Sequence, residues 1–265
     1  MVLPYPQKPD CLYVISREQM DDVASLVLHR HCPWCLENHN RTPLLTLADR
    51  LGIEVRFTHP AARDVLGMMY MTGEGEDVDC FEYDESGAEV HHQVFATPGT
   101  AIIAPDENRR REYFTLAHEI SHWILHDGYY SRLEKRAEKG RLMQTHTACR
   151  EENVFGGAPA GSLRTDEDWM EWQANALASS LLMPKSMFIA RARGAIKDAR
   201  IAGDRPGTAA GADDENCEKE RRVIGELALF YGVSRQAVSI RLKRLGILVP
   251  LNREFTGKGH AERSI

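Results

Sequence analysis

Residues 115–126 read Thr-Leu-Ala-His-Glu-Ile-Ser-His-Trp-Ile-Leu-His, and this stretch decides the fold. Its periodicity predicts one helix, in which His118 and His122 lie one turn apart and project from the same face. Two imidazoles in this arrangement can bind one metal ion, with Glu119 beside them as a general base. An arc of hydrophobic residues falls opposite the histidines, namely Tyr113, Leu116, Ala117, Ile120, Trp123 and Ile124. We therefore expect a helix that buries one side and turns the other toward a metal site.

A second helix is predicted from its N-cap Thr165 to Pro184, which ends it. This helix matters because a hydrolytic zinc site uses three protein ligands and leaves a fourth position for water. Glu171 and Asn175 lie one turn apart, so a carboxylate and an amide can point toward the histidines together. The first turn offers three further carboxylates, Asp166, Glu167 and Asp168. The helix dipole already explains acidic residues in a first turn, so Glu171 is the predicted third ligand.

These motifs resemble those of the ImmA/IrrE-type metallopeptidases, a family of bacterial proteins. The resemblance rests on the His118 helix and on two later motifs, Glu171-x-x-Ala174-Asn175 and Leu181-Leu182-Met183-Pro184. It covers residues 15–190 in the order of the elements, and weakly a C-terminal helical hairpin. It implies a gluzincin-like metallopeptidase domain, a metal held by His118, His122 and Glu171, and Glu119 as the catalytic base. It also implies the substrate, an XRE-type helix-turn-helix repressor of a mobile element or a stress response.

The chemistry expected of such a site is hydrolysis of a peptide bond without a covalent intermediate. Glu119 would take a proton from the attacking water and later deliver it to the leaving amine. We expect one zinc ion (Zn2+) as the cofactor, although two histidines and a glutamate also accept Mn2+ or Fe2+. His126 continues the spacing of the histidines, and we assign it a packing or supporting role because Glu171 completes the site. Four residues are candidates for stabilising the oxyanion: His126, Tyr129, Tyr130 and His146.

The sequence leaves two functions open. The first is a metal-dependent endopeptidase that acts on a regulatory protein. The second is a non-catalytic regulator of the same fold that binds a repressor or DNA, with the metal structural or absent. Glu119 favours the first function, because a binding protein has no need for a base next to a metal.

The composition is typical of a water-soluble globular protein of one or two domains. The 265 residues are 43% hydrophobic and 27% charged. The net charge of −6 argues against a nucleic-acid-binding surface that covers the whole chain. No segment has the pattern of a signal peptide or of a membrane span, so we expect a cytoplasmic location and no membrane partner. Six cysteines in that compartment predict free thiols instead of disulfides.

The motif Cys32-Pro33-Trp34-Cys35 has three interpretations. A turn without special function is favoured, because the motif follows a predicted helix over 18–31, whereas redox pairs usually sit at a helix N-terminus. Redox chemistry of the pair is the second interpretation. The third is a structural metal site completed by His31 or by a distant cysteine.

The order of the elements predicts an α+β fold, in which a small sheet packs on the His118 and Glu171 helices. Helices are expected over 18–31, with Ser16 as its cap, and over 42–51. Strands are expected over 53–57, 65–71, 81–83, 90–96 and 100–104. The strands just before the His118 helix would offer a sheet edge to an extended substrate. Residues 127–164 are expected to form a loop-rich rim.

We divide the chain into a metallopeptidase domain (1–197), a flexible linker (198–217), a helical hairpin (218–250) and a disordered tail (251–265). The hairpin is predicted as two helices, over 220–230 and 235–245. They are joined through Gly232, with Ser234 as N-cap and Gly246 as stop. This pattern resembles a helix-turn-helix.

The hairpin has three interpretations: packing on the catalytic domain, recognition of a partner protein, and contact with DNA. Residues 218–246 contain seven basic and three acidic residues. This modest basic excess makes DNA contact the least favoured interpretation, and packing the most favoured.

Overall fold

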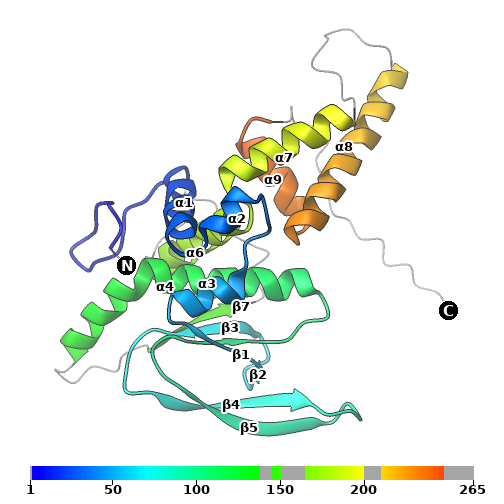
Figure 1. The fold of residues 1–265 in the computed structure, drawn as a ribbon. Coiled ribbons are helices and arrows are strands. Elements are labelled where there is room, and N and C mark those ends of the chain that lie inside the picture. The colour runs from blue at the N-terminus through cyan, green and yellow to red at the C-terminus, as the bar shows by residue number, and fades with distance from the viewer. Residues whose placement is uncertain (1, 138–144, 151–164, 200–209, 248–265) are drawn as a thin grey trace.

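The chain folds into a mixed α+β structure, as the sequence predicts (Figure 1). The computed structural model describes residues 2–137, 145–150, 165–199 and 210–247. The helices are α1 (Gln19–His31), α2 (Pro33–Glu37), α3 (Leu44–Arg50), α4 (Arg109–Ala137), α6 (Asp166–Leu182), α7 (Lys185–Asp198), α8 (Ala210–Tyr231) and α9 (Arg235–Arg244). The strands are β1 (Glu54–Phe57), β2 (His59–Pro60), β3 (Val65–Tyr70), β4 (Glu76–Tyr83), β5 (Glu89–Ala96), β6 (Thr100–Ile103) and β7 (His146–Arg150). The two helices predicted before residue 52 and the five strands predicted between 53 and 104 are present. Their ends shift by one or two residues, except that β4, predicted over 81–83, already begins at Glu76.

Helix α4, which carries the His-Glu-x-x-His motif, lies between a layer of helices and a sheet (Figure 1). It packs against α6 on one side, with α1 behind α6, and against β3, β6 and β7 on the other. The predicted hydrophobic arc is confirmed, because Leu116, Ala117 and Ile120 are buried in the core. His118 and His122 are buried as well. The side of α4 that carries the histidines is therefore enclosed by the protein.

The main sheet has four strands in the order β1-β6-β3-β7. Strand β1 runs parallel to β6, whereas β3 is antiparallel to both β6 and β7. A second sheet, in the order β2-β4-β5, lies beyond it (Figure 1). Strand β6, which directly precedes α4, is an inner strand, and β1 and β7 are the two edges among the described strands. The edge strand β1 is one of the strands predicted before α4, whereas β7, the edge whose residues contact Glu119, follows α4 in the sequence and was not predicted.

The loop-rich rim predicted over residues 127–164 was wrong where the structure describes it. Helix α4 continues to Ala137, and residues 146–150 form β7. The helix extends because Tyr130 buries its ring in the core and gives this segment a packed side. Residues 138–144 and 151–164 of the predicted rim lie outside the described residues.

The predicted helical hairpin is present as α8 and α9. Gly232 joins the helices with a φ of +65°, which favours glycine, and Ser234 Oγ accepts a hydrogen bond from Ala237 N (3.0 Å). Helix α8 already begins at Ala210, so the flexible linker predicted over 198–217 was wrong for residues 210–217. Its residues 200–209, and the predicted tail 251–265, lie outside the described residues.

The hairpin packs on the rest of the chain through a shared hydrophobic core. Val223, Leu227, Tyr231, Val238 and Leu242 belong to the same buried cluster as the core residues of α1, α4 and α6. Hydrophobic burial of this kind is the main force that holds elements together. This contact supports the interpretation that the hairpin packs on the catalytic part of the chain.

A buried ion pair anchors the second helix of the hairpin. Arg241 Nη2 on α9 lies 2.5 Å from Asp21 Oδ1 on α1, and it also donates to Met183 O (2.9 Å) at the end of α6. The side chains of Arg241 and Asp21 are 1% and 7% exposed, so the pair is almost fully withdrawn from water. Three elements that are far apart in the sequence therefore meet at one guanidinium group.

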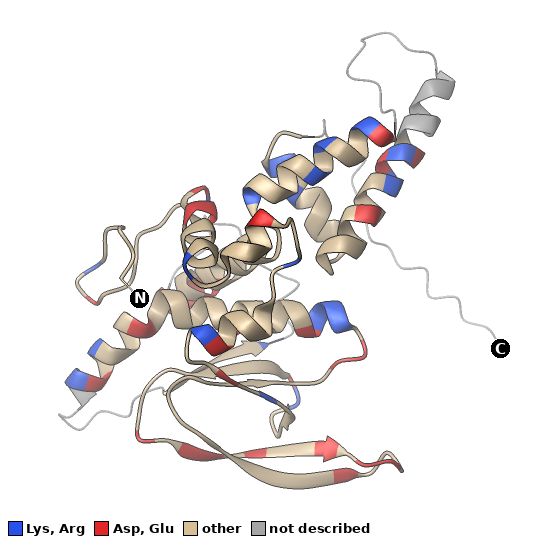
Figure 2. Cartoon of the chain, viewed as in Figure 1, with Lys and Arg blue, Asp and Glu red and all other residues tan. Residues whose placement is uncertain are grey.

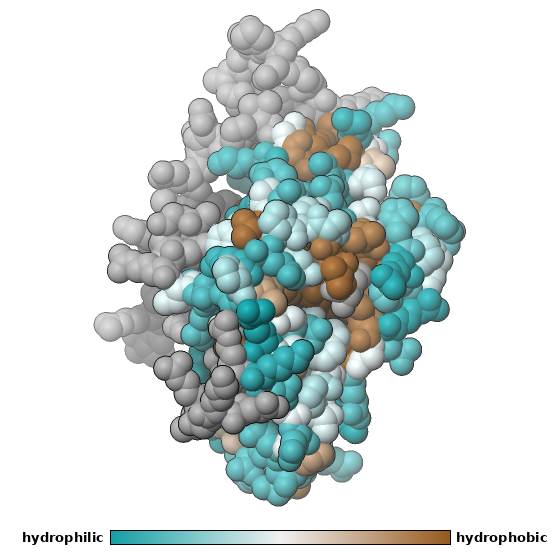
Figure 3. Space-filling model, turned by 90° about the vertical axis from the view of Figure 1, so that its left-hand side faces the viewer, coloured by the Kyte–Doolittle hydropathy of each residue, from teal (hydrophilic) through white to brown (hydrophobic). Residues whose placement is uncertain are grey.

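The charged residues are distributed unevenly over the molecule. Acidic residues line the β4–β5 hairpin, whereas lysines and arginines predominate on α7 and α9 (Figure 2). On the face shown in Figure 3, hydrophobic surface forms separate patches among hydrophilic residues. None of the described helices is long and apolar enough to cross a membrane.

Candidate metal centre

The three predicted ligands come together where α4 faces α6. His118 Nε2 and His122 Nε2 lie 3.0 Å apart. Glu171 places Oε1 3.1 Å from His122 Nε2 and Oε2 3.4 Å from His118 Nε2. The two histidines are almost completely buried, and the side chain of Glu171 is 19% exposed. These side chains form a group that could hold one metal ion.

The start of α6 explains why Glu171 and not an earlier carboxylate reaches the histidines. Thr165 Oγ1 accepts from Asp168 N (3.0 Å), and Asp168 Oδ2 accepts from Thr165 N (2.9 Å), which is a capping box. Asp166 is 2.8 Å from Lys8 Nζ, and Glu167 is exposed. The first-turn carboxylates thus serve the helix end or the surface, and Glu171 lies on the face that meets α4.

The other ring nitrogen of His118 is held by the amide that the sequence placed one turn after Glu171. His118 Nδ1 donates to Asn175 Oδ1 at 3.1 Å. With its proton on Nδ1, the neutral ring has its lone pair on Nε2. That lone pair points toward His122 and Glu171.

His122 is oriented by a chain of hydrogen bonds that runs away from the centre. Gln173 Nε2 donates to Tyr13 O (2.7 Å), so its Oε1 accepts from His126 Nε2 (3.1 Å). His126 Nδ1 then has a free lone pair and accepts from His122 Nδ1 (3.0 Å). Burial lowers the pKa of His126 well below its ordinary value, which keeps this ring neutral. The chain leaves the Nε2 lone pair of His122 directed at the centre.

The surroundings of the two imidazoles favour a positive charge between them. Burial opposes ionisation of Glu171, but the rings of His122 and His118 lower its pKa well below the ordinary value. Burial lowers the pKa of His122, whereas Cys149 and Glu171 beside His118 outweigh burial and raise the pKa of His118 well above its ordinary value. A proton and a metal ion are alternatives at His118 Nε2, because both use the same lone pair. Glu171 Oε2 is buried and has no hydrogen-bond partner. Two nitrogen lone pairs and a carboxylate that meet in one place fit a divalent cation with nitrogen and oxygen ligands.

Glu119 lies next to this group and is held by β7. Its Oε2 accepts from Thr147 Oγ1 (3.1 Å), and the carboxylate also accepts from the backbone N–H of Cys149. Its Oε1 is buried without a partner. Burial raises the pKa of Glu119 to about 8, and a cation bound by the neighbouring histidines would lower it again and favour the ionised base. The carboxylate is therefore positioned by two donors and retains one free oxygen.

Gly67 on β3 allows α4 to approach the sheet closely. A Cβ atom at this position would lie 2.5 Å from Thr115 Cγ2 and 3.0 Å from Glu119 Oε1. Contacts as short as the first are not tolerated, so any side chain here would push α4 or its residues away. Gly67 is thus part of the reason that Glu119 can sit between the helix and the sheet.

Sequence reasoning did not identify Gly67, Thr147 or Cys149. They reach the centre through the pairing of β3 with β7, in which Gly67 lies opposite Cys149. The alternation of Thr147 and Cys149 on one strand face was the only available signal, and it falls in a segment of five residues. Strand pairing joins parts of the chain about eighty residues apart, which a local pattern does not reveal.

The supporting role predicted for His126 agrees with its contacts to His122 and Gln173. Of the other oxyanion candidates, Tyr130 is buried in the core and His146 Nδ1 lies 3.8 Å from Glu76. Neither of these positions places Tyr130 or His146 next to the proposed metal ligands.

The Cys32-x-x-Cys35 motif forms part of the core. Cys32 precedes the short helix α2 and Cys35 lies within it, and both side chains are buried. Burial raises the pKa of both thiols, that of Cys35 to about 11. All six cysteines are free, as predicted. Protonated, buried thiols favour the interpretation of a turn without special function over redox chemistry.

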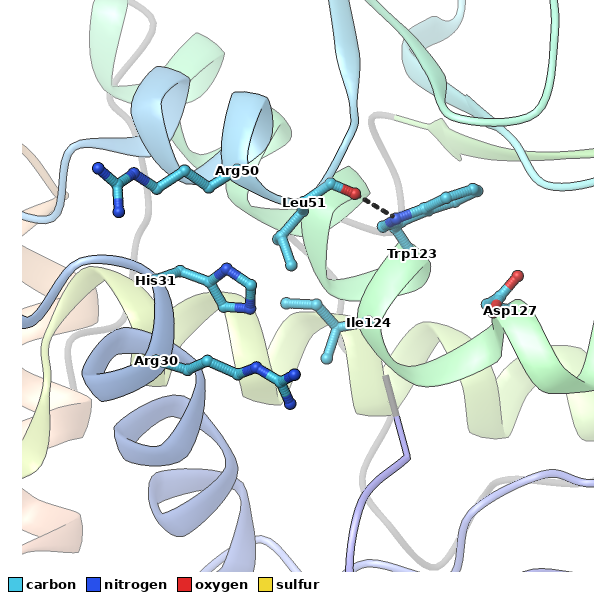
Figure 4. Close-up of a pocket in the computed structure, with 7 residues that line it drawn as sticks. All are labelled: Arg30, His31, Arg50, Leu51, Trp123, Ile124 and Asp127. Carbon is cyan, nitrogen blue, oxygen red and sulfur yellow. Dashed lines mark hydrogen bonds between the residues drawn. The ribbon is translucent and has the colours of Figure 1, made fainter.

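A separate pocket lies between α4, the end of α1 and the end of α3 (Figure 4). Its lining residues are Arg30, His31, Arg50, Leu51, Trp123, Ile124 and Asp127. Trp123 Nε1 donates to Leu51 O (3.2 Å) across it. Asp127 and His118 are nine residues apart, which places them on opposite sides of the helix. The pocket is therefore distinct from the metal centre.

The site has two paired histidines on α4, a downstream glutamate on α6, and the buried carboxylate of Glu119 next to the histidines. This set of side chains is typical of metallopeptidases with a His-Glu-x-x-His helix. The family model for the IrrE N-terminal-like domain of the M78 peptidases matches residues 48–243, which is more than half of the chain. The chain therefore belongs to this family, and the resemblance seen in the sequence is confirmed. The match includes α8 and most of α9. No match was found among the curated proteins.

Proposed function

We propose that the protein is a metal-dependent endopeptidase that hydrolyses a peptide bond in a regulatory protein. The observation that carries this proposal is the orientation of the two imidazoles. His118 Nδ1 and His122 Nδ1 both donate outward, so both Nε2 atoms face the carboxylate of Glu171. With Glu119 beside them, these residues have the gluzincin-like arrangement of three ligands and one base.

His118, His122 and Glu171 would hold the ion, with zinc as the preferred metal for this ligand set. When bound, the ion supplies a Lewis acid that polarises the scissile carbonyl and makes a water molecule more acidic. Glu119 takes the proton of the attacking water at its free oxygen Oε1 and returns it to the leaving amine. Thr147 and the backbone N–H of Cys149 keep the carboxylate in place during both transfers.

An extended peptide is the form of substrate that the sheet can accept. Strand β7 is one of the two edges of the four-stranded sheet, and Thr147 on it donates to the carboxylate of Glu119. A peptide that pairs with an edge strand binds through its backbone and presents alternate side chains to the enzyme. Pairing along β7 would bring the scissile bond next to Glu119.

A helix-turn-helix repressor of the XRE type is the substrate that we propose, on the basis of the ImmA/IrrE resemblance. A cytoplasmic location agrees with this substrate and with six free cysteines. The α8–α9 hairpin, which has the order of a helix-turn-helix, has a packing role in this proposal. Arg241 of the hairpin is buried and paired with Asp21, so its positive charge does not contribute to a surface that could bind DNA.

The substitution Glu119→Gln tests catalysis against binding. The amide keeps the size of the carboxylate but does not accept a proton, so cleavage should fall by about 10²-fold or more while metal content and fold are retained. The substrates to test are the XRE-type repressors encoded in the same genome, each as a purified protein, with mass spectrometry of the products.

The matched control is Glu112→Gln on the first turn of α4, which should cleave like the wild type. If Glu119→Gln cleaves as fast as the wild type, Glu119 is not the base. A different outcome would support the non-catalytic regulator. In that case the wild type cleaves none of the repressors, and the wild type and Glu119→Gln bind one of the repressors with equal affinity.

A further inference from the structure

Cys149 is a buried thiol beside the metal centre that the ligand set described above does not use. Its Sγ, a ring nitrogen of His118 and a carboxylate oxygen of Glu119 all lie within 4.8 Å of one another, and all three residues are buried. Among the described residues, no other cysteine belongs to such a group of metal-binding side chains. The position of this thiol therefore requires a separate explanation.

The position of Cys149 on β7 directs its side chain toward the proposed metal centre. Thr147 lies two residues earlier on the same face of β7 and donates to Glu119. The residue opposite Cys149 in the sheet is Gly67, which has no side chain. Because Gly67 has no side chain, the paired position on β3 does not separate the thiol from α4. The thiol interacts with the ring of His118 on that helix.

A second observation at the same place points to a cation. Glu119 Oε1 is buried and has no hydrogen-bond partner, and the buried Glu171 Oε2 has only His118 Nε2 beside it, 3.4 Å away. Buried carboxylate oxygens without a partner are costly unless a positive group faces them. Sulfur, imidazole nitrogen and carboxylate oxygen are all ligands of zinc.

We propose that Cys149 is a fourth protein ligand, which binds the same ion as His118, His122 and Glu171 in a resting form of the enzyme. This inference rests on the proposed metal centre. In a tetrahedral zinc site, sulfur at about 2.3 Å and nitrogen at about 2.0 Å from the ion lie about 3.5 Å apart. Cys149 Sγ and a ring nitrogen of His118 lie within 4.8 Å of each other, whereas Cys149 does not belong to the group that His118 forms with His122 and Glu171. Binding the shared ion therefore requires the thiol to rotate toward His118.

Binding of Cys149 to the ion requires no oxidant or reductant. The thiol releases its proton to solvent and its sulfur forms one bond to the ion, with no electron transferred. Four protein ligands leave no position for water, which is the mark of a structural rather than a catalytic site. Hydrolysis would then require that water and substrate replace Cys149, so this residue would limit activity until a substrate occupies β7.

The experiment uses the full chain loaded with Co2+ in place of the native metal. A thiolate bound to Co2+ gives a charge-transfer band in the near ultraviolet, in addition to the visible bands that any bound Co2+ gives. We expect this band in the wild-type protein and its loss in Cys149→Ser. The matched control is Cys80→Ser, which removes another buried thiol on a strand, in the second sheet, and should keep the band.

Metal affinity gives an independent measurement. Loss of a supporting partner of a metal ligand costs about 10–100-fold in affinity, so loss of a ligand in Cys149→Ser should cost at least about tenfold in competition with a chelator. Visible Co2+ bands without the charge-transfer band in the wild type would overturn the role of Cys149, whether or not the variant folds. In that case the proposed metal centre stands. Failure of the wild type to bind Co2+ at all would instead overturn the metal centre itself.

Discussion

Gly67 makes the approach of Glu119 to the sheet possible, although it carries no functional group. Replacing it with Ala adds a Cβ only 2.5 Å from Thr115 Cγ2. We expect Gly67→Ala to lower the free energy of unfolding by about 1–3 kcal/mol, the usual cost of overpacking, and to reduce cleavage because Glu119 is displaced. Chemical denaturation and the repressor assay measure the two effects.

The control for this substitution is Gly194→Ala on the exposed face of α7, where a new Cβ meets nothing within 4 Å. This variant should be as stable as the wild type or slightly more stable. The double variant Gly67→Ala/Thr115→Ser removes the clashing methyl and should recover part of the loss. A Gly67→Ala protein with unchanged stability and activity would show that α4 does not depend on this close approach.

His126 contacts His122, and we predict that it supports the proposed metal centre through this ring. Replacing His126 with Leu leaves His122 Nδ1 without its acceptor at 3.0 Å, so the ring is no longer fixed in the tautomer that binds metal. We expect the metal affinity to fall by about 10–100-fold, measured by competition with a chelator. The control His29→Leu changes an exposed histidine on α1 and should leave the affinity unchanged. Equal affinities for both variants would contradict the positioning role.

The residues of the site differ in how well they could be predicted. His118, His122, Glu171 and Asn175 were found because the spacing of one helical turn is written directly in the sequence. Glu171 was separated from the nearby acidic residues by helix geometry. Thr147 escaped prediction, because its position depends on the register of two strands and on the side of the sheet on which α4 lies.

At the scale of elements, α1, α6 and α9 are joined by the ion pair of Arg241 with Asp21 and by the bond to Met183 O. Replacing Arg241 with Met leaves the Asp21 carboxylate buried and unpaired, which typically costs about 3–5 kcal/mol. We expect this loss in the free energy of unfolding of Arg241→Met, measured with denaturant. The double variant Arg241→Met/Asp21→Leu should be much less destabilised, because no buried charge remains. Additive losses in the double variant would contradict a direct pairing of the two groups.

Elements with strong local signals were predicted well. Helix α6 has the predicted N-cap Thr165 and ends at Leu182, two residues before the predicted stop at Pro184. Strand β7 was missed because it is five residues long and is stabilised by its pairing with β3. The start of α8 was missed because Gly, Ala and Asp over 210–214 resemble a linker, although the chain is helical there.

At the scale of the whole molecule, the hairpin belongs to the core of the peptidase. Helices α8 and α9 contribute Leu227 and Leu242, among others, to the main hydrophobic cluster. We therefore expect that a chain ending at Ala199 unfolds at a much lower temperature and loses metal, because a large part of its core is exposed. A chain ending at Ile247 is the control and should behave like the full chain. A stable, metal-binding protein that ends at Ala199 and fails only to process repressor would instead show that the hairpin is a recognition module.

The central claim is that His118, His122 and Glu171 hold one divalent ion. The most direct measurement is the metal content of purified protein after dialysis, for the wild type, Glu171→Ala and Glu167→Ala. Glu167 is the matched control, since it is a glutamate one turn earlier on α6 and is exposed. We predict about one ion per chain in the wild type and in Glu167→Ala, and loss of the ion in Glu171→Ala. Full metal content in Glu171→Ala would contradict the claim.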